Sequence, residues 1–270
     1  GEQARPEDIE AFREEMGLND PFIVRYVNYM LGLCQGDLGT SYKTRDPVGE
    51  EVWARLPNTA MLALTSTVVA ILLALPLGII AAIKQNTLFD GISMFISLLG
   101  ISMPVFWMGL LLILFFSVKL GWFPVSGADQ GIKSLVLPSI ALGFMHMASI
   151  ARTTRSSMLE TIRQDYIRTV RAKGLPEKEV ITRHALRNAL IPTTTVIGLQ
   201  IGGMLGGSVL TESVFAWPGI GRYMIQSIQG RDIPSVMGCI IIFALSFAVI
   251  NLIVDLIYGF IDPRIKAQYK

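Results

Sequence analysis

Long parts of this 270-residue sequence contain no Asp, Glu, Lys or Arg. Charged residues make up 16% of the chain, against roughly 25% in an average soluble domain. A helix needs roughly 20 apolar residues to cross a bilayer, so the pattern excludes a soluble globular protein and predicts five membrane-spanning helices. Alternation of period two, typical of a membrane barrel, is absent from the same stretches. They are residues 56–83, 91–118, 134–151, 188–211 and 233–254.

The sequence also lacks the residue patterns of a catalytic or metal centre. Its two cysteines, Cys34 and Cys239, and its two histidines have no metal-ligand spacing. Residues 127–134 have the wrong glycine and lysine spacing for a phosphate-binding loop. His146 and Asp255 are the only ionisable residues expected in or beside the later spans, too few for a proton or sodium relay. We therefore expect no catalytic residue, metal or cofactor on this chain, and an energy source elsewhere if it moves a solute.

His146 lies within the third charge-free stretch, which is the shortest. An ionisable group inside a membrane is a functional candidate. A neutral, hydrogen-bonded packing residue is the alternative, and the position of this single His near the end of the stretch favours it.

The charges are distributed unevenly along the chain. Residues 1–55 contain six Lys/Arg and eleven Asp/Glu, residues 152–187 contain nine and four, and residues 262–270 contain three and one. Because Lys and Arg accumulate on the cytoplasmic side, the 152–187 loop and the C-terminus are predicted to be cytoplasmic. Five spans then place the acidic N-terminal segment outside. We expect a further span before residue 1 that carries this segment across the membrane.

Several local patterns refine the expected helices. Residues 21–33 carry an apolar stripe at helical spacing, expected to pack on the membrane-facing body. Pro104 interrupts the second predicted span, 92–118, where a kink is expected. In the fourth span, small residues at four-residue spacing predict close helix packing, as in an interface that slides. These glycines are Gly198, Gly202 and Gly206.

The basic loop 152–187 carries two helix signals. Gly174 is suited to end the first predicted helix in a left-handed conformation, and Pro176 to open a second one. The loop either rests on anionic headgroups or forms a helix–Gly–helix docking element for a cytoplasmic partner. The apolar residues of the first helix recur at three- and four-residue steps: Leu159, Ile162, Tyr166 and Val170.

The string from Asp165 to Leu175, followed by 184–192, resembles the cytoplasmic loop of ATP-binding-cassette import permeases, more narrowly the oligopeptide/dipeptide/nickel subfamily. The Gly-Asp-Leu-Gly element at 36–39 resembles the B-type member of the permease pair. The general loop motif has Glu-Ala-Ala where this chain has Arg168, Thr169 and Val170. Further matching motifs lie at 16–21, 55–59, 124–127 and 216–222.

The resemblance implies an all-α integral membrane protein with the helical bundle of a type I importer permease. Residues 1–58 would be an extracytoplasmic segment after a missing first span, and residues 59–270 the permease domain with a coupling loop at 152–190. The chain would be a multi-pass protein of the prokaryotic plasma (inner) membrane. The residues that the motif assigns to coupling are Asp165, Tyr166, Thr169, Ala172, Lys173, Gly174, Leu175 and Glu177.

The resemblance also implies partners. These are a second related permease in a heterodimer, two cytoplasmic ATPases that hold ATP and Mg, an extracytoplasmic solute-binding protein and membrane lipid, without nucleic acid. The expected function is half of the translocation pathway for di- or oligopeptides or related solutes, without enzymatic activity on this chain. The alternatives are a nickel or metal-chelate permease, or a non-transporting membrane anchor or sensor. The glycines and prolines of the spans favour a moving pathway over an anchor.

Overall fold

The computed structural model describes residues 5–15 and 17–261 and is built of helices, with one isolated bridge between Thr40 and Pro47. The expected all-α class is confirmed. Met16, in one of the family-like motifs, and the basic tail 262–270 lie outside the described residues. The helices are α1 (Pro6–Glu15), α2 (Phe22–Cys34), α3 (Val48–Ile83), α4 (Leu88–Ser102), α5 (Val105–Leu112), the π-helical η1 (Ile113–Lys119), α6 (Ile132–Ile162), α7 (Asp165–Ala172), α8 (Glu177–Glu179), the π-helical η2 (Val180–Ala185), α9 (Leu186–Val214), α10 (Ile220–Gln229) and α11 (Ile233–Ile261).

Four of the described helices are long and apolar enough to cross a membrane: α3, α6, the helix from Glu177 through Gly206, and α11. A fifth span is present if α4 and the α5–η1 helix count as one, and this agrees with the five predicted. The two parts meet at 106°, so the expected kink is a complete break. Met103 is extended and Pro104 has no N–H to continue the helix, which explains why the ladder of hydrogen bonds stops there.

Two helices extend well beyond the predicted spans. α3, with 36 residues, is about 54 Å long, and α6, with 31, is about 46 Å long. Both exceed the roughly 30 Å hydrocarbon core. The third predicted span, which was the shortest, is therefore part of a long helix. The expected domain boundary between residues 58 and 59 lies within α3.

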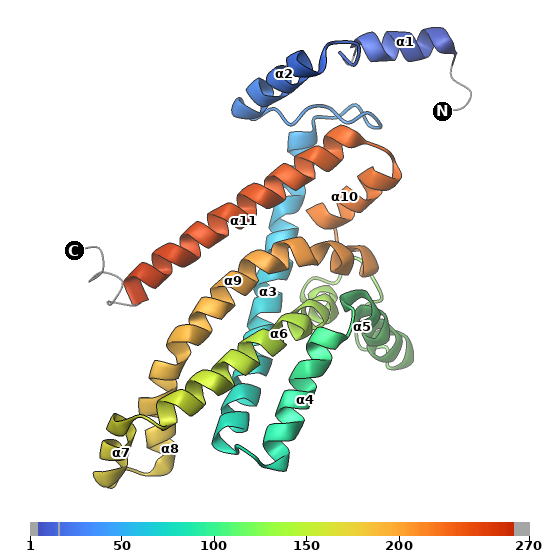
Figure 1. The fold of residues 1–270 in the computed structure, drawn as a ribbon. Helices are drawn as coiled ribbons and strands as arrows, with labels where there is room; N and C mark the ends of the chain where they lie inside the picture. Colours follow the sequence, from blue (N-terminus) through green and yellow to red (C-terminus); the bar gives the residue numbers. More distant parts are fainter. Residues whose placement is uncertain (1–4, 16, 262–270) are drawn as a thin grey trace, which may run out of the picture.

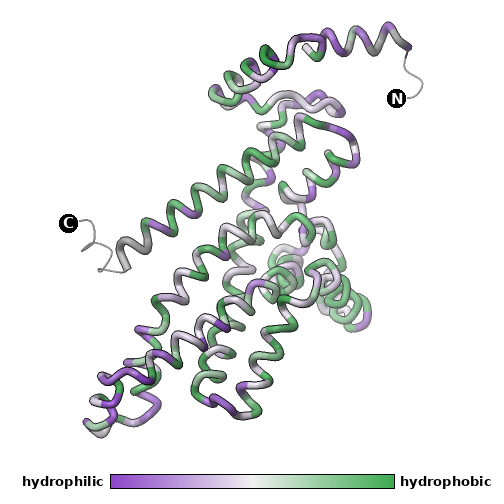
Figure 2. The backbone as a smooth tube through the Cα atoms, in the orientation of Figure 1, coloured by the Kyte–Doolittle hydropathy of each residue, from purple (hydrophilic) through white to green (hydrophobic). Residues whose placement is uncertain are grey.

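The ends of the bundle differ from its middle. α1 and α2 lie at one end and α7 and α8 at the opposite end (Figure 1). Figure 2 shows hydrophilic residues gathered at α1 and at the α7–α8 end, with hydrophobic residues between them. None of the residues of α2, all of which the structure describes, is buried; Phe22 is 77% exposed. The expected packing on the body is found only at the end of the stripe, where the partly buried Leu33 packs against the cluster that includes Leu38 and Val48.

Close backbone contact in the core occurs between α3 and α6. A Cβ on Gly78 of α3 would lie 2.6 Å from the carbonyl oxygen of Ala151, and one on Gly143 of α6 would lie 2.7 Å from that of Ser66. Glycine therefore permits the approach of these two helices at two levels. The central apolar cluster around them includes Leu62, Leu142, Met147, Ile150 and Met204.

At the α10 end, two of the family-like motifs bind each other. Asn58 Nδ2 donates to the Pro218 carbonyl oxygen at 2.9 Å, and Trp217 Nε1 donates to the Asn58 carbonyl oxygen at 3.0 Å. The Ile220 amide donates to Thr59 Oγ1 at 2.9 Å. These bonds hold the turn between α9 and α10 against α3, because Asn58 and Thr59 are residues of α3.

Glu212 is a buried ionisable residue that the sequence analysis missed. It is fully buried, and its Oε2 accepts the Arg222 amide at 3.1 Å, while Oε1 has no partner. A Cβ on Gly219 would overlap its carboxyl group, so that glycine makes the room it needs. The prediction that His146 and Asp255 are the only ionisable residues near the later spans is wrong.

Asp232, just before α11, joins the turn at residues 41–45 to the last helix. Ser41 Oγ donates to Oδ2 at 2.6 Å, Ser235 Oγ at 2.7 Å, and the Tyr42 amide donates to Oδ1 at 2.9 Å. Burial would raise the pKa of the Asp232 carboxyl, but these hydrogen bonds outweigh it and hold the pKa below its ordinary value.

We expect Gly143→Ala to destabilise the subunit by about 1–3 kcal/mol, because the new methyl group forces α3 and α6 apart. The thermal unfolding midpoint of the purified protein measures this. Gly91→Ala on α4 is the matched control, since a Cβ there has no atom within 4 Å. An unfolding midpoint for Gly143→Ala equal to that of Gly91→Ala would contradict the role of close packing.

We expect Asp232→Asn to cost about 1–3 kcal/mol at neutral pH, because the amide nitrogen cannot accept a hydroxyl proton. A carboxyl with a depressed folded-state pKa contributes stability above its unfolded pKa, about 3.9, and loses it as pH falls through the folded pKa. The difference in unfolding midpoint between wild type and variant should therefore shrink as pH falls below about 4. A difference that is constant with pH would show that the charge is irrelevant.

Candidate functional site

The coupling residues predicted from the sequence lie on α7 and the turn that follows it. The expected helix over Leu159–Val170 is in fact two: α6 continues to Ile162, and α7 begins at Asp165 after a short turn. Leu159 and Ile162 thus belong to the end of a long span. Only α7, with eight residues, is separate from that span.

α7 is seated on the bundle by Ile167, its one buried side chain, with the partly buried Val170 beside it. Ile167 is fully buried, in an apolar cluster with residues from three long helices. Burying an isoleucine is worth roughly 1.5–3 kcal/mol, so the contact fixes α7 to the ends of those helices. The buried members are Ala82 of α3, Met158 of α6, Ile167, and Val180, Ile181, Ala185 and Ala189 of η2 and α9.

The turn after α7 has the predicted geometry. Gly174 has φ +81°, and its amide donates to the Arg171 carbonyl oxygen at 2.9 Å. Pro176 precedes α8, which runs on through η2 into α9. The left-handed glycine and the proline start are both confirmed. A Cβ at Gly174 would meet no atom within 4 Å, so the requirement is for its backbone conformation and not for space.

An ion pair closes this turn. Arg171 donates to Glu177 through Nε at 3.0 Å and Nη2 at 2.7 Å. The paired geometry holds the end of α7 beside the start of α8. Glu177, predicted as a coupling residue, is therefore engaged within this chain.

Tyr166 also bonds within this chain. Its hydroxyl accepts from Asn188 Nδ2 at 2.6 Å and donates to the His184 carbonyl oxygen at 3.4 Å, while the residue is 40% exposed. The ring offers surface to a partner, and the hydroxyl ties α7 to α9.

The remaining predicted coupling residues divide into two groups. Leu175 is partly buried against the Ile167 cluster. The others share the outward side of α7 and its turn, where they are exposed: Asp165, Thr169, Ala172, Lys173 and Gly174. This outward set is the surface that another protein can contact.

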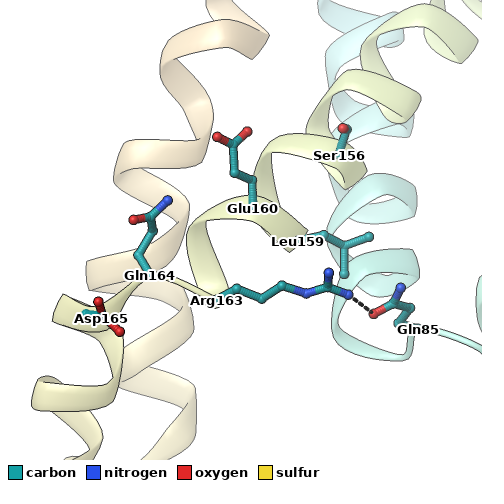
Figure 3. Close-up of a pocket in the computed structure, with 7 residues that line it drawn as sticks. All are labelled: Gln85, Ser156, Leu159, Glu160, Arg163, Gln164 and Asp165. Atoms are coloured by element: carbon teal, nitrogen blue, oxygen red, sulfur yellow. Dashed lines mark hydrogen bonds between the residues drawn. The ribbon is translucent and has the colours of Figure 1, made fainter.

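A pocket of about 510 Å³ lies beside the start of α7. In Figure 3, Arg163 extends from the end of α6 to Gln85 in the α3–α4 turn, and its Nη2 donates to Gln85 Oε1 at 3.2 Å. Glu160 and Asp165 also line the pocket. Its lining residues thus come from the α3–α4 turn, the end of α6 and the start of α7.

The other predicted residues lie away from α7. His146 Nδ1 is 2.9 Å from Gln200 Oε1 of α9, while its Nε2 is buried without a partner. This fits the packing interpretation. A Cβ on Gly202 would meet Phe247 of α11 at 3.0 Å, whereas one on Gly206 would meet no atom within 4 Å. Gly198, on the same helix, is buried.

Within residues 5–15 and 17–261, no group of three or more His, Cys, Asp or Glu side chains is arranged to hold a metal ion. The geometry instead offers a helix that is exposed on one side and anchored on the other to three long helices. Such an arrangement can transmit a displacement from a bound protein to the membrane-spanning helices.

The chain is similar in sequence to known membrane transport proteins. Residues 74–267 match the family described as binding-protein-dependent transport system inner membrane component. The chain is 48% identical to the dipeptide transport system permease protein DppB of Alkalihalophilus pseudofirmus, over 98% of this chain and 88% of that protein. It is 44% identical to the glutathione transport system permease protein GsiC of Escherichia coli K12, over 98% and 87%.

Solved structures share the fold. An inward-facing form of the MetNI methionine ABC transporter has a TM-score of 0.67 at 18% identity, covering 78% of this chain and 96% of that one. An amino acid ABC transporter crystallised with histidines has a TM-score of 0.62 at 15% identity, covering 78% and 94%. The fold, the family match and the extent of the relatives lead to one conclusion. The chain belongs to the family of inner-membrane components of binding-protein-dependent transport systems.

Proposed function

We propose that this chain is a permease subunit of an ATP-driven importer and forms half of the pathway for di- or oligopeptides. The observation that carries the proposal is the exposed face of α7 seated by Ile167 on the ends of α3, α6 and α9. The names of the relatives, for dipeptide and glutathione transport, favour peptides over the nickel or metal-chelate alternative. A membrane anchor would not need a docking helix fixed to several spans.

The two ends of the bundle then have different surroundings. The α7 end faces the cytoplasm, as does the C-terminus, because Lys and Arg exceed Asp and Glu by nine to four in residues 152–187. Residues 1–58, with α1 and α2, form the extracytoplasmic segment, and residues 59–270 the permease domain with its coupling loop at 152–190. This places α10 and Asp232 on the outer side.

The partners divide the remaining tasks. Two cytoplasmic ATPases hold ATP and Mg, and one of them binds the outward residues of α7. An extracytoplasmic binding protein delivers the solute, and a second related permease completes the pathway as a heterodimer. Gly206, with open space around it, is the glycine of α9 best placed for that second permease, while Gly202 and the buried Gly198 serve packing within this chain.

We expect Gly174→Val to leave the subunit inserted and assembled but to reduce peptide uptake and peptide-stimulated ATP hydrolysis sharply. A left-handed conformation costs a residue with a Cβ about 1–2 kcal/mol, which shifts α7 without unfolding the bundle. Uptake into proteoliposomes containing the whole complex, with ATP hydrolysis assayed in parallel, measures this.

Two variants sharpen that experiment. Tyr166→Phe keeps the exposed ring and removes the hydroxyl bonds, whereas Tyr166→Ala removes both, so the pair separates docking from internal support. Lys178→Ala, on an exposed residue outside the coupling set, should transport like wild type. Normal uptake by Gly174→Val with its ATPases attached would remove the coupling role from this loop.

For the orientation, a cysteine placed at Asp129 or Gln229 should react with an impermeant thiol reagent added to intact cells. One placed at Lys178 should react only after permeabilisation, because positively charged loops remain inside. All three positions are exposed. Cys34 is exposed and is first replaced by Ser, so that it does not contribute to the signal. Labelling at position 178 in intact cells would reverse the assignment of sides.

A further inference from the structure

Asp90 and Arg155 form an ion pair between α4 and α6 that the coupling loop does not include. Arg155 Nε donates to Asp90 Oδ1 at 2.8 Å, and its Nη2 donates to Oδ2 at 2.7 Å. Asp90 Oδ2 also accepts the Asn86 amide at 3.1 Å. Both carboxylate oxygens are therefore engaged, and the α3–α4 turn is tied to the end of α6.

This pair is better shielded than a surface salt bridge. The Asp90 side chain is 10% exposed and that of Arg155 is 26% exposed. Removing one member of a shielded pair leaves a charge without a partner in a poorly hydrated place, which costs more than losing an exposed pair. The ion pairs within the loop that lie nearby are more exposed, as with Arg183 and Glu179 at 75% and 39%.

A second contact joins the same two helices farther along. A Cβ on Gly100 of α4 would overlap the carbonyl oxygen of Phe144 of α6. From Asp90 to Gly100 and from Phe144 to Arg155 the helices rise about 15 Å and about 16.5 Å, so the two contacts match in register along antiparallel helices. α4 is thus fastened to α6 at two points before the break at Met103 and Pro104.

We propose that Asp90 and Arg155 are positioning residues for transport, which fasten α4 to α6 so that a displacement of α7 moves both helices as one body. The inference rests on the proposed function. α6 leads directly into α7, whereas the chain from α4 reaches α7 only by way of α5, η1 and α6. The ion pair therefore joins α4 directly to the helix that leads into α7, and the break at Pro104 is the hinge about which α4 turns.

The first test neutralises the pair in the assembled complex. Asp90→Asn keeps the size of the side chain and leaves Arg155 without its counter-charge. We expect the peptide transported per ATP hydrolysed to fall about fivefold or more, the lower end of typical coupling between sites. Glu179→Gln, which breaks an exposed pair within one helical segment, is the matched control and should leave the ratio unchanged. Peptide transport and ATP hydrolysis are both measured on purified, assembled complex. A lower yield of folded protein therefore does not change the ratio between them.

The second test restores the connection by a covalent link. Asp90→Cys and Arg155→Cys are combined in a chain whose Cys34 and Cys239 have been replaced by Ser and Ala. Before linking, the ratio should be low. After reaction with a flexible, membrane-permeant bifunctional maleimide, it should recover, because α4 and α6 are again one body.

Each outcome decides one question. If wild-type complex shows no ATP-dependent peptide uptake, the proposed function is wrong and the ratio is not defined. If wild type transports and Asp90→Asn keeps the wild-type ratio, the positioning role is wrong. If the linked double-cysteine complex hydrolyses ATP but no longer transports, α4 and α6 must separate during the cycle, and the inference is overturned.

Discussion

Ile167 lies at the junction of α7 with the long helices of the bundle, and its complete burial constrains everything around it. The cluster that covers it draws on α3, α6, η2 and α9, so α7 cannot shift without disturbing the ends of these helices. Truncating a buried isoleucine typically costs about 2–5 kcal/mol, a large part of the stability of a small element. The outward side of α7 stays exposed while the inward side is held in this way.

The rest of the molecule extends this junction toward the other end. Glycines allow α3 and α6 to touch along their length, and the Asp90–Arg155 pair brings α4 into the same group. At the α10 end, hydrogen bonds from Asn58 and Trp217 and the Asp232 network hold the turns on either side of α10. A force applied at α7 thus meets a stiff set of helices, with the break before Pro104 as the place where the direction of the chain changes.

Features set by local chemistry were predicted from the sequence. The turn at Gly174 and Pro176 was predicted because glycine and proline have strong conformational preferences of their own. The spans were predicted because they are long apolar stretches. Features that depend on distant partners were missed. Glu212 is buried because Gly219 makes room for it, and Asp90 meets Arg155 across 65 residues, neither of which a local pattern reveals. The length of α6 was missed because the charged residues after Ala151 end the apolar stretch but not the helix. The exposure of most of α2 was missed because an apolar stripe does not say what covers it.

The central claim is that α7 and the ends of the long helices move together. Spin labels at positions 168 and 187, both exposed, report the separation of α7 from the start of α9 by pulsed electron paramagnetic resonance. Measured in the whole complex without nucleotide and after trapping with ATP and vanadate, with loss of ATP turnover as proof of trapping, the two distance distributions should coincide. A shifted distribution in the trapped complex would show that α7 moves independently of α9, and would contradict the account.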